Sequence, residues 1–121
     1  MKSMILSAII AIAFPIMAMA EPAYYIFQLQ IDDRDAYMKD YVSRVMPTIM
    51  EHKGKLLVAS PDPQVVEGKW TGNQAVIIEF ESRKAAEAWY SSSEYKAIRP
   101  YRLKAASTNN SILVDKFVFP K

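Results

Sequence analysis

Two carboxylates in the second half of the chain are the side chains best placed to do chemistry. Glu79 lies in the apolar segment 74–81 (QAVIIEFE), and Asp115 lies in the segment 111–119 (SILVDKFVF). A carboxylate among apolar residues can have a raised pKa, which suits it to general acid or base catalysis. We therefore predict Glu79 and Asp115 as catalytic residues. The alternative is structural: each would belong to an interface ion pair, with Arg99, Arg102 or a residue of a partner chain as the opposite charge.

The sequence offers few other chemical groups. It contains no cysteine and one histidine, His52. Thiol chemistry and thiolate metal sites are therefore excluded, and no cluster has the spacing of metal ligands. His52 precedes Gly54 at the predicted end of a helix, where an imidazole interacts favourably with the last carbonyls. We predict no metal and no cofactor. Haem binding is the weakest alternative, because His52 is the one strong axial candidate and lies away from the predicted site.

The first twenty residues have the layout of a secretory signal peptide. Lys2 is followed by the uncharged apolar run 4–19, and Ala18-Met19-Ala20 forms a cleavage site. This predicts an exported protein, periplasmic or secreted, that begins at Glu21 and has no stable membrane insertion after cleavage. A retained membrane anchor is the alternative, which the short run and Pro15 disfavour.

The remaining residues, 21–121, are enough for one domain with a modest core. The whole chain has 15 basic and 13 acidic residues. Such a balanced charge gives no electrostatic footprint for nucleic acid or for an anionic membrane. Without disulfides, the domain must be held together by its own core or by a core that a partner subunit completes.

The hydrophobic periodicity predicts strands at residues 24–31, 55–59, 74–81 and 111–119, because apolar residues alternate or cluster there. Two helical segments separate them. The first begins after the N-cap Asp33, carries an apolar residue every four positions, is kinked or divided at Met46 by Pro47, and ends at a left-handed Gly54. The second begins after Ser82 and restarts after Ser92. The order β-α-β-β-α-β predicts an α+β, ferredoxin-like fold: a four-stranded antiparallel sheet with two helices on one face.

The sheet face away from the helices is predicted to be mixed in character. By alternation it would carry Tyr24, Ile26, Gln28, Ile77, Glu79, Leu113, Asp115 and Phe117. This face is too apolar to remain in water and too polar for an ordinary core, so we predict a homodimer that buries it.

Several residues are predicted to bind a small-molecule ligand. Tyr24 and Gln28 lie on the mixed face, and Trp70 lies on a predicted loop, where it would act as a lid or a dimer contact. Trp89 could stack on a planar ligand, although an aromatic residue at helical spacing commonly belongs to the core. Arg99 completes the predicted ligand-binding set.

A set of short motifs spans nearly the whole mature domain: Ala23-Tyr24-Tyr25, Asp33-x-x-Ala36-Tyr37-x-x-Tyr41, Gly54, Val66-Glu67-Gly68, Glu79-Phe80-x-Ser82, Ala85, Ala88, Trp89, Tyr90, Ser92-x-Glu94-Tyr95, Arg99 and Val114-Asp115. In these residues the chain resembles the domain-of-unknown-function family numbered thirteen-thirty, within the dimeric α/β-barrel (ferredoxin-like) superfamily. The resemblance is carried by the combination of motifs. It implies a dimeric barrel and no particular activity. The wider superfamily includes cofactor-free monooxygenases, isomerases and haem-degrading enzymes, so it implies only a range of functions. The chain departs from its relatives at residues 59–63, where a basic residue and Gly-Gly are usual, at Lys116, where Gly is usual, and in its export signal.

Together these patterns predict an exported small-molecule-binding domain. If the domain is an enzyme, it would catalyse a cofactor-independent reaction on a hydrophobic or aromatic compound. The alternative is a non-catalytic homodimeric structural or accessory module, in which the mixed face serves only to dimerise.

Overall fold

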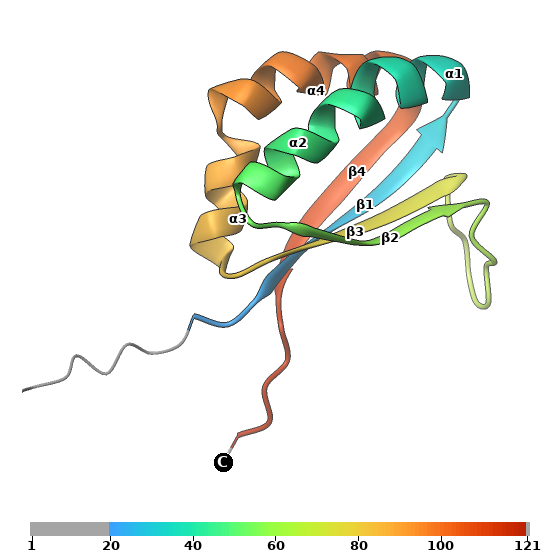
Figure 1. Cartoon of the computed structure of the whole chain (residues 1–121). Coiled ribbons are helices and arrows are strands. Elements are labelled where there is room, and N and C mark those ends of the chain that lie inside the picture. The colour runs from blue at the N-terminus through green and yellow to red at the C-terminus, as the bar shows by residue number, and fades with distance from the viewer. Residues whose placement is uncertain (1–19, 121) are drawn as a thin grey trace, which may run out of the picture.

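The computed structural model describes residues 20–120. Apart from Ala20, the predicted signal peptide lies outside the described residues. In chain order the elements are β1 (Ala23–Ile31), α1 (Arg34–Ala36), η1 (Tyr37–Val42, a stretch of π-helix), α2 (Ser43–Glu51), β2 (Lys55–Pro61), β3 (Gln74–Phe80), α3 (Arg83–Tyr90), α4 (Ser93–Ala105) and β4 (Ala106–Asp115) (Figure 1).

The four strands form one antiparallel sheet in the order β2-β3-β1-β4. All the helices lie over one face of this sheet, and the other face is left open (Figure 1). Strands β1 and β3 are the inner pair, and every residue of β1 that points toward the helices is buried. The predicted α+β, ferredoxin-like fold is confirmed.

The predicted N-caps are all confirmed. Asp33 Oδ1 accepts a hydrogen bond from the Ala36 amide at 3.0 Å. Ser82 and Ser92 each accept a hydrogen bond from the amide three residues later, so the second helical segment divides into α3 and α4 where the sequence indicates. These caps depend on local backbone geometry, which explains why a short stretch of sequence is enough to predict them.

The first helical segment is continuous from Arg34 to Glu51, so of the two effects predicted for Pro47, a kink or a division at Met46, the division is wrong. Pro47 lies inside α2, and the irregular turns lie before it, in η1. A proline removes the hydrogen bond to the carbonyl four residues earlier, here that of Ser43. This carbonyl lies where η1 ends, and the wide turns of a π-helix accommodate such a lost bond without ending the helix.

The turn after α2 also differs from the prediction. Lys53, with φ of 56°, is the left-handed residue, whereas Gly54 has no positive φ. Gly54 is needed for a different reason. A Cβ at this position would lie 2.7 Å from Phe80 Cε1 and 2.8 Å from Ile49 Cγ2. A glycine therefore lets the chain pass directly over the core as it enters β2.

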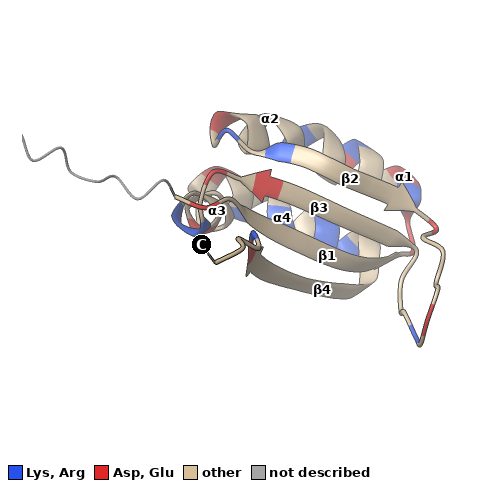
Figure 2. Ribbon diagram, turned by 90° about the horizontal axis from the view of Figure 1, so that it is seen from below, with Lys and Arg blue, Asp and Glu red and all other residues tan. Residues whose placement is uncertain are grey.

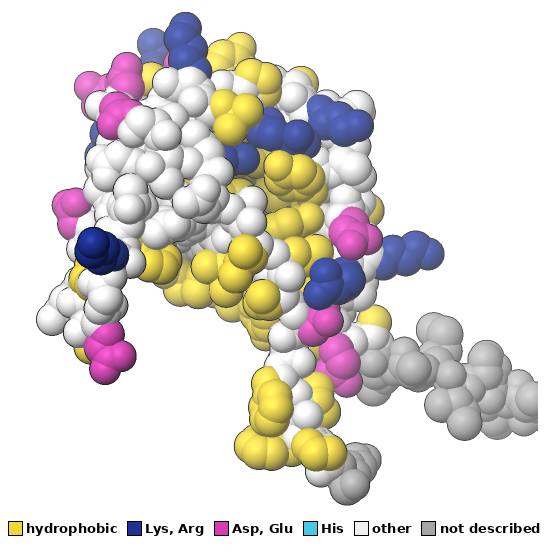
Figure 3. Space-filling model, turned by 180° about the vertical axis from the view of Figure 1, so that it is seen from behind, with side chains coloured by type: hydrophobic (Ala, Val, Ile, Leu, Met, Phe, Trp, Pro, Cys, Tyr) yellow, Lys and Arg dark blue, Asp and Glu magenta, His cyan; other side chains and the backbone are white. Residues whose placement is uncertain are grey.

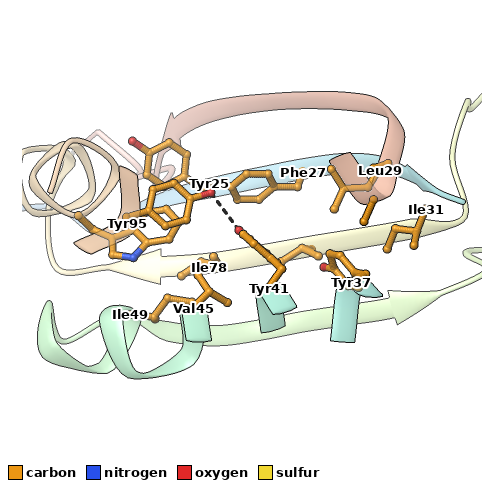
Figure 4. Close-up of a cluster of buried hydrophobic side chains, with 14 of the residues drawn as sticks. Tyr25, Phe27, Leu29, Ile31, Tyr37, Tyr41, Val45, Ile49, Ile78 and Tyr95 are labelled. Atoms are coloured by element: carbon orange, nitrogen blue, oxygen red, sulfur yellow. Dashed lines mark hydrogen bonds between the residues drawn. The ribbon is translucent and has the colours of Figure 1, made fainter. Parts of the chain in front are cut away.

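The core fills the space between the helices and the sheet (Figure 4). At one end, Trp89 is completely buried among the rings of Tyr25, Phe80 and Tyr95. Its indole Nε1 donates a hydrogen bond to Thr48 Oγ1 at 3.0 Å, which ties α3 to α2. At the other end the first helical segment covers β1 and β3, and its packing there leaves a cavity.

The register of β4 corrects the predicted composition of the open face. β4 begins at Ala106 and ends at Asp115, whereas the sequence predicts 111–119. Leu113 pairs with Tyr25 and Asp115 pairs with Ala23, and both partners are buried on the helix side. Directly paired residues point to the same face of a sheet. Leu113 and Asp115 therefore lie on the helix side, not on the open face, and Phe117 lies beyond the strand.

Candidate functional site

The open face of the sheet carries some of the predicted site residues. Figure 2 looks onto this face and shows that charged residues are confined to the strand ends. Glu79 pairs across the sheet with Tyr24 on β1 and Lys55 on β2. A hydrogen bond with the Glu79 carboxylate raises the pKa of Tyr24. Gln28 Oε1 accepts a hydrogen bond from Asn110 Nδ2 at 3.0 Å. Tyr24, Gln28 and Glu79 therefore lie on one face, as predicted.

The second predicted catalytic carboxylate lies elsewhere. Asp115 Oδ1 accepts a hydrogen bond from Arg83 Nε at 3.0 Å and lies 3.0 Å from Arg83 Nη2, forming an exposed ion pair. β4 is also an edge strand, not a central one. The structure thus separates Glu79 and Asp115 onto opposite faces of the sheet, so they do not form an acid–base pair within one chain.

The remaining predicted ligand contacts are dispersed. Trp89 belongs to the core, and Trp70 is 40% exposed on the loop between β2 and β3. The Arg99 guanidinium lies 4.1 Å from the centre of the Tyr90 ring, and its Nη2 donates to the Tyr90 carbonyl at 2.8 Å. Arg99 therefore links α4 to the end of α3.

A partly open cavity of about 250 Å³ lies within the described part of the chain. It lies between the first helical segment and the helix-facing side of β1, β2 and β3. Its apolar walls are formed by Phe27, Leu29, Met38, Val42, Val45, Met46, Ile49, Leu56, Ala59, Pro61, Val76 and Ile78. Its polar walls are formed by Arg34, Tyr37, Tyr41, Gln74 and Arg102. Largely apolar walls with a few converging polar groups are typical of a small-molecule site.

Residues of the polar walls take part in two hydrogen bonds. Arg34 Nη1 donates to Gln74 Oε1 at 3.1 Å. The hydroxyls of Tyr41 and Tyr95 are 2.9 Å apart and hydrogen-bonded (Figure 4). Burial raises the pKa of Tyr37 to about 12, although the guanidiniums of Arg102 and Arg34 act to lower it. Tyr37 therefore lies within the electrostatic reach of both cations.

None of the predicted site residues lines the cavity, so sequence reasoning missed it. One signal was present. Arg102 occupies the apolar stripe of α4 between Tyr95 and Ala105, which are both buried. A charged residue at a core position of a helix is uncommon unless it is paired or functional.

Buried tyrosines predict a loss of stability at alkaline pH. Burial raises the pKa of Tyr25 and of Tyr37 to about 12, and raises that of Tyr41 well above its usual value. The unfolded chain, whose tyrosines titrate near pH 10, therefore loses these protons first. The stability that depends on these groups is complete below pH 10 and is lost as the pH rises through 12. The expected slope is about 1.4 kcal/mol per pH unit for each tyrosine.

Denaturant unfolding at a series of alkaline pH values measures this loss, and tyrosinate absorbance of the folded protein follows the ionisation itself. A free energy of unfolding that stays constant from pH 10 to 12 would contradict the burial of these hydroxyls.

No group of three or more His, Cys, Asp and Glu side chains within residues 20–120 is arranged to hold a metal ion. Over the same residues, no helix has the length and apolar character needed to cross a membrane.

Comparison with known proteins decides the family. The family model described as "Domain of unknown function (DUF1330)" matches residues 22–117. The chain belongs to this family. The match covers the whole sheet and every helix, and it confirms the resemblance seen in the sequence. A search among curated proteins finds no match.

Solved structures share the fold of this DUF1330 protein at low sequence identity. A protein of unknown function from Rhodopseudomonas palustris, RPA0582, has a TM-score of 0.69 and 14% identity over 81% of this chain and 84% of its own. SnoaB from Streptomyces nogalater, described as a cofactor-independent oxygenase, has a TM-score of 0.54 and 12% identity over 84% and 96%. A dimeric ferredoxin-like protein of unknown function from Thermobifida fusca has a TM-score of 0.51 and 10% identity over 80% and 92%. At these identities the likeness establishes the fold alone.

Proposed function

We propose that this DUF1330 protein binds a small, largely apolar molecule in the cavity between its first helical segment and the sheet. The observation that carries the proposal is the cavity itself, a partly open space of about 250 Å³ with apolar walls and a few polar groups. An apolar cavity of about 150 Å³ accommodates benzene, so this one has room for a compound of one or two rings.

We propose further that the protein catalyses a cofactor-independent reaction on the bound compound. The support for this reaction is the shared fold with SnoaB, which is described as a cofactor-independent oxygenase. The catalytic roles of Glu79 and Asp115 stay predictions, and neither carboxylate lines the cavity. Tyr37 and Tyr41, which line the cavity, are the nearer candidates for proton transfer to a bound compound.

Blocking the cavity tests the binding proposal. Ala59 lines the cavity from β2, whereas Leu57, two positions earlier on the same strand, does not. We expect Ala59→Trp to fill part of the cavity and to abolish the stabilisation that indole, a neutral two-ring probe, gives to the folded protein. Leu57→Trp adds the same side chain to the same strand and should leave that stabilisation unchanged. Thermal unfolding with and without indole measures both. If indole stabilises neither wild type nor variants, or stabilises all equally, the cavity is not a binding site.

A second proposal concerns assembly: the open face joins two copies of the chain in a homodimer. Ile112 is 58% exposed on this face, and Ile26, Ile77 and Val114 are only half-buried. In Figure 3 hydrophobic side chains extend across the middle of the molecule, and a further group projects below it at the C-terminal end. The structural neighbour from Thermobifida fusca, described as dimeric, supports this assembly. A non-catalytic homodimeric module would need only this face and would not need the cavity.

We propose, finally, that the protein is exported and begins at Glu21. The support is the signal-peptide layout of residues 1–20 together with a family match that begins at residue 22. Mass spectrometry of the protein recovered from the exported fraction should give the mass of residues 21–121. A chain that retains the first twenty residues would refute cleavage.

A further inference from the structure

Arg102 brings a positive charge into the protein without a carboxylate to balance it. Its side chain is 3% exposed, and a guanidinium stays protonated in proteins. Nη1 donates to Asn109 Oδ1 at 2.9 Å, and Nη2 lies 3.4 Å from the Tyr95 hydroxyl, so both partners are neutral. The single ion pair found within residues 20–120 joins Arg83 and Asp115. A buried charge without a counter-charge is unfavourable, and this one calls for an anion from outside the chain.

The third guanidinium nitrogen of Arg102, Nε, has its hydrogen-bonding capacity unused within residues 20–120. Arg102 Nε is buried and has no hydrogen-bond partner among the described residues. The guanidinium lies 5.2 Å from the ring centre of Phe27 and 5.8 Å from that of Tyr41. These aromatic faces offset part of the charge but cannot accept the Nε–H hydrogen bond as a carboxylate would. Because Arg102 forms part of the cavity wall, an anion in the cavity would lie beside this guanidinium and offset its charge.

The other charged residue of the polar wall is also positive. Arg34 is the second cation, and its observed partner is the neutral amide of Gln74. No Asp or Glu lines the cavity within the described part of the chain. The hydroxyls of Tyr37 and Tyr41 are uncharged at neutral pH, as tyrosines ordinarily are, and burial raises the pKa of both further. The cavity therefore contains two positive charges and no group that neutralises them.

We propose that the ligand of this cavity is an organic anion: a flat apolar body of one or two rings that carries one carboxylate. The body would lie against the apolar wall formed by Val45, Ile49 and Ile78, and the carboxylate would lie between the guanidiniums of Arg102 and Arg34. This inference rests on the proposed binding function, because it concerns the same cavity and specifies the class of molecule that enters it.

Two probes of nearly equal shape test whether the cavity prefers a ligand with a negative charge. 2-Naphthoate and 2-naphthamide differ in the group attached to the same pair of rings, a carboxylate in one and a neutral amide in the other. We expect the wild-type protein to bind 2-naphthoate at least about tenfold more tightly, since hydrogen bonds to a charged acceptor are the stronger kind. Isothermal titration calorimetry at neutral pH gives both affinities.

Removing the buried charge should remove this preference. Arg102→Met keeps a long, flexible side chain without the charge. We expect it to weaken 2-naphthoate binding by about tenfold to a hundredfold and to change 2-naphthamide binding by less than about twofold. If this variant does not fold, Arg34→Met, on the half-buried cation of the same wall, should weaken only the carboxylate in the same sense. The wild-type comparison of the two probes needs no variant.

The outcomes distinguish a failure of the anion inference from a failure of the proposed binding function on which it rests. If both probes bind equally to wild type, the anion inference is wrong while the cavity remains a binding site. If neither probe binds, or if Ala59→Trp leaves their binding unchanged, the proposed function fails and the inference fails with it. A preference for 2-naphthoate that Arg102→Met abolishes, together with loss of both probes in Ala59→Trp, supports both.

Discussion

Trp89→Ala should lower the free energy of unfolding by about 3–5 kcal/mol, the usual cost of truncating a fully buried aromatic side chain. Trp89 is 0% exposed, and its ring centre lies 4.1 Å from that of Tyr95 and 5.3 Å from that of Phe80. The substitution leaves a cavity between α3, α4 and the sheet, and it leaves Thr48 Oγ1 without the indole donor. A domain of this size has about 5–15 kcal/mol of stability in all, so the variant would be close to unfolding.

The chain contains a matched control for this result. Trp70 is 40% exposed on the loop between β2 and β3, so Trp70→Ala should change the free energy of unfolding by no more than about 0.5 kcal/mol. Urea unfolding followed by far-ultraviolet circular dichroism measures both, at one protein concentration because dimerisation would add to stability. Equal losses in the two variants would mean that Trp89 does not hold the core together.

Ile77→Glu should convert the proposed dimer into monomers. Ile77 is near the centre of the open face on the inner strand β3, with Ile26 and Val58 directly beside it. Under two-fold symmetry the substitution appears twice in one interface, so two carboxylates would lose water without gaining a partner. The dissociation constant should rise by at least about a hundredfold. The monomer should keep its fold, because position 77 faces solvent when the chain is alone.

Analytical ultracentrifugation over a range of concentrations measures this change. Val66→Glu is the control, because Val66 is 85% exposed on the loop between β2 and β3 and not on the open face. It should leave the dissociation constant of the wild type unaltered. If Ile77→Glu remains as dimeric as the wild type, the open face is not the interface. A monomeric wild type would refute the dimer itself.

Features that depend on local chemistry were predictable from the sequence. The alternation of residues 24–31 identifies β1, and the serines at 82 and 92 mark the starts of α3 and α4. A cap or an alternating strand is specified by side chains within a few residues of one another, so a short stretch contains all the information. The order of these elements then leaves few topologies, of which the ferredoxin-like sheet is one.

Predictions failed where distant segments meet. The polar stretch 107–111 does not look like a strand, yet it pairs along β1 as the first half of β4. Its register places Asp115 on the helix side, so the second predicted catalytic carboxylate became half of a surface ion pair with Arg83. Pairing register is set by the neighbouring strand and by bulges such as the one between Gln30 and Ile31, which the sequence of β4 does not contain.

The sequence by itself determined the family, the order of the elements and the helix caps Asp33, Ser82 and Ser92. The tertiary structure decided that Gly54 is required by its closeness to Phe80 and Ile49, and that Arg102 faces an apolar cavity with no acid beside it. The physical reason is the separation along the chain of the residues that each feature involves. Propensity and capping act along the chain, whereas a cavity and an unbalanced charge exist only once segments that are far apart in sequence are packed against one another.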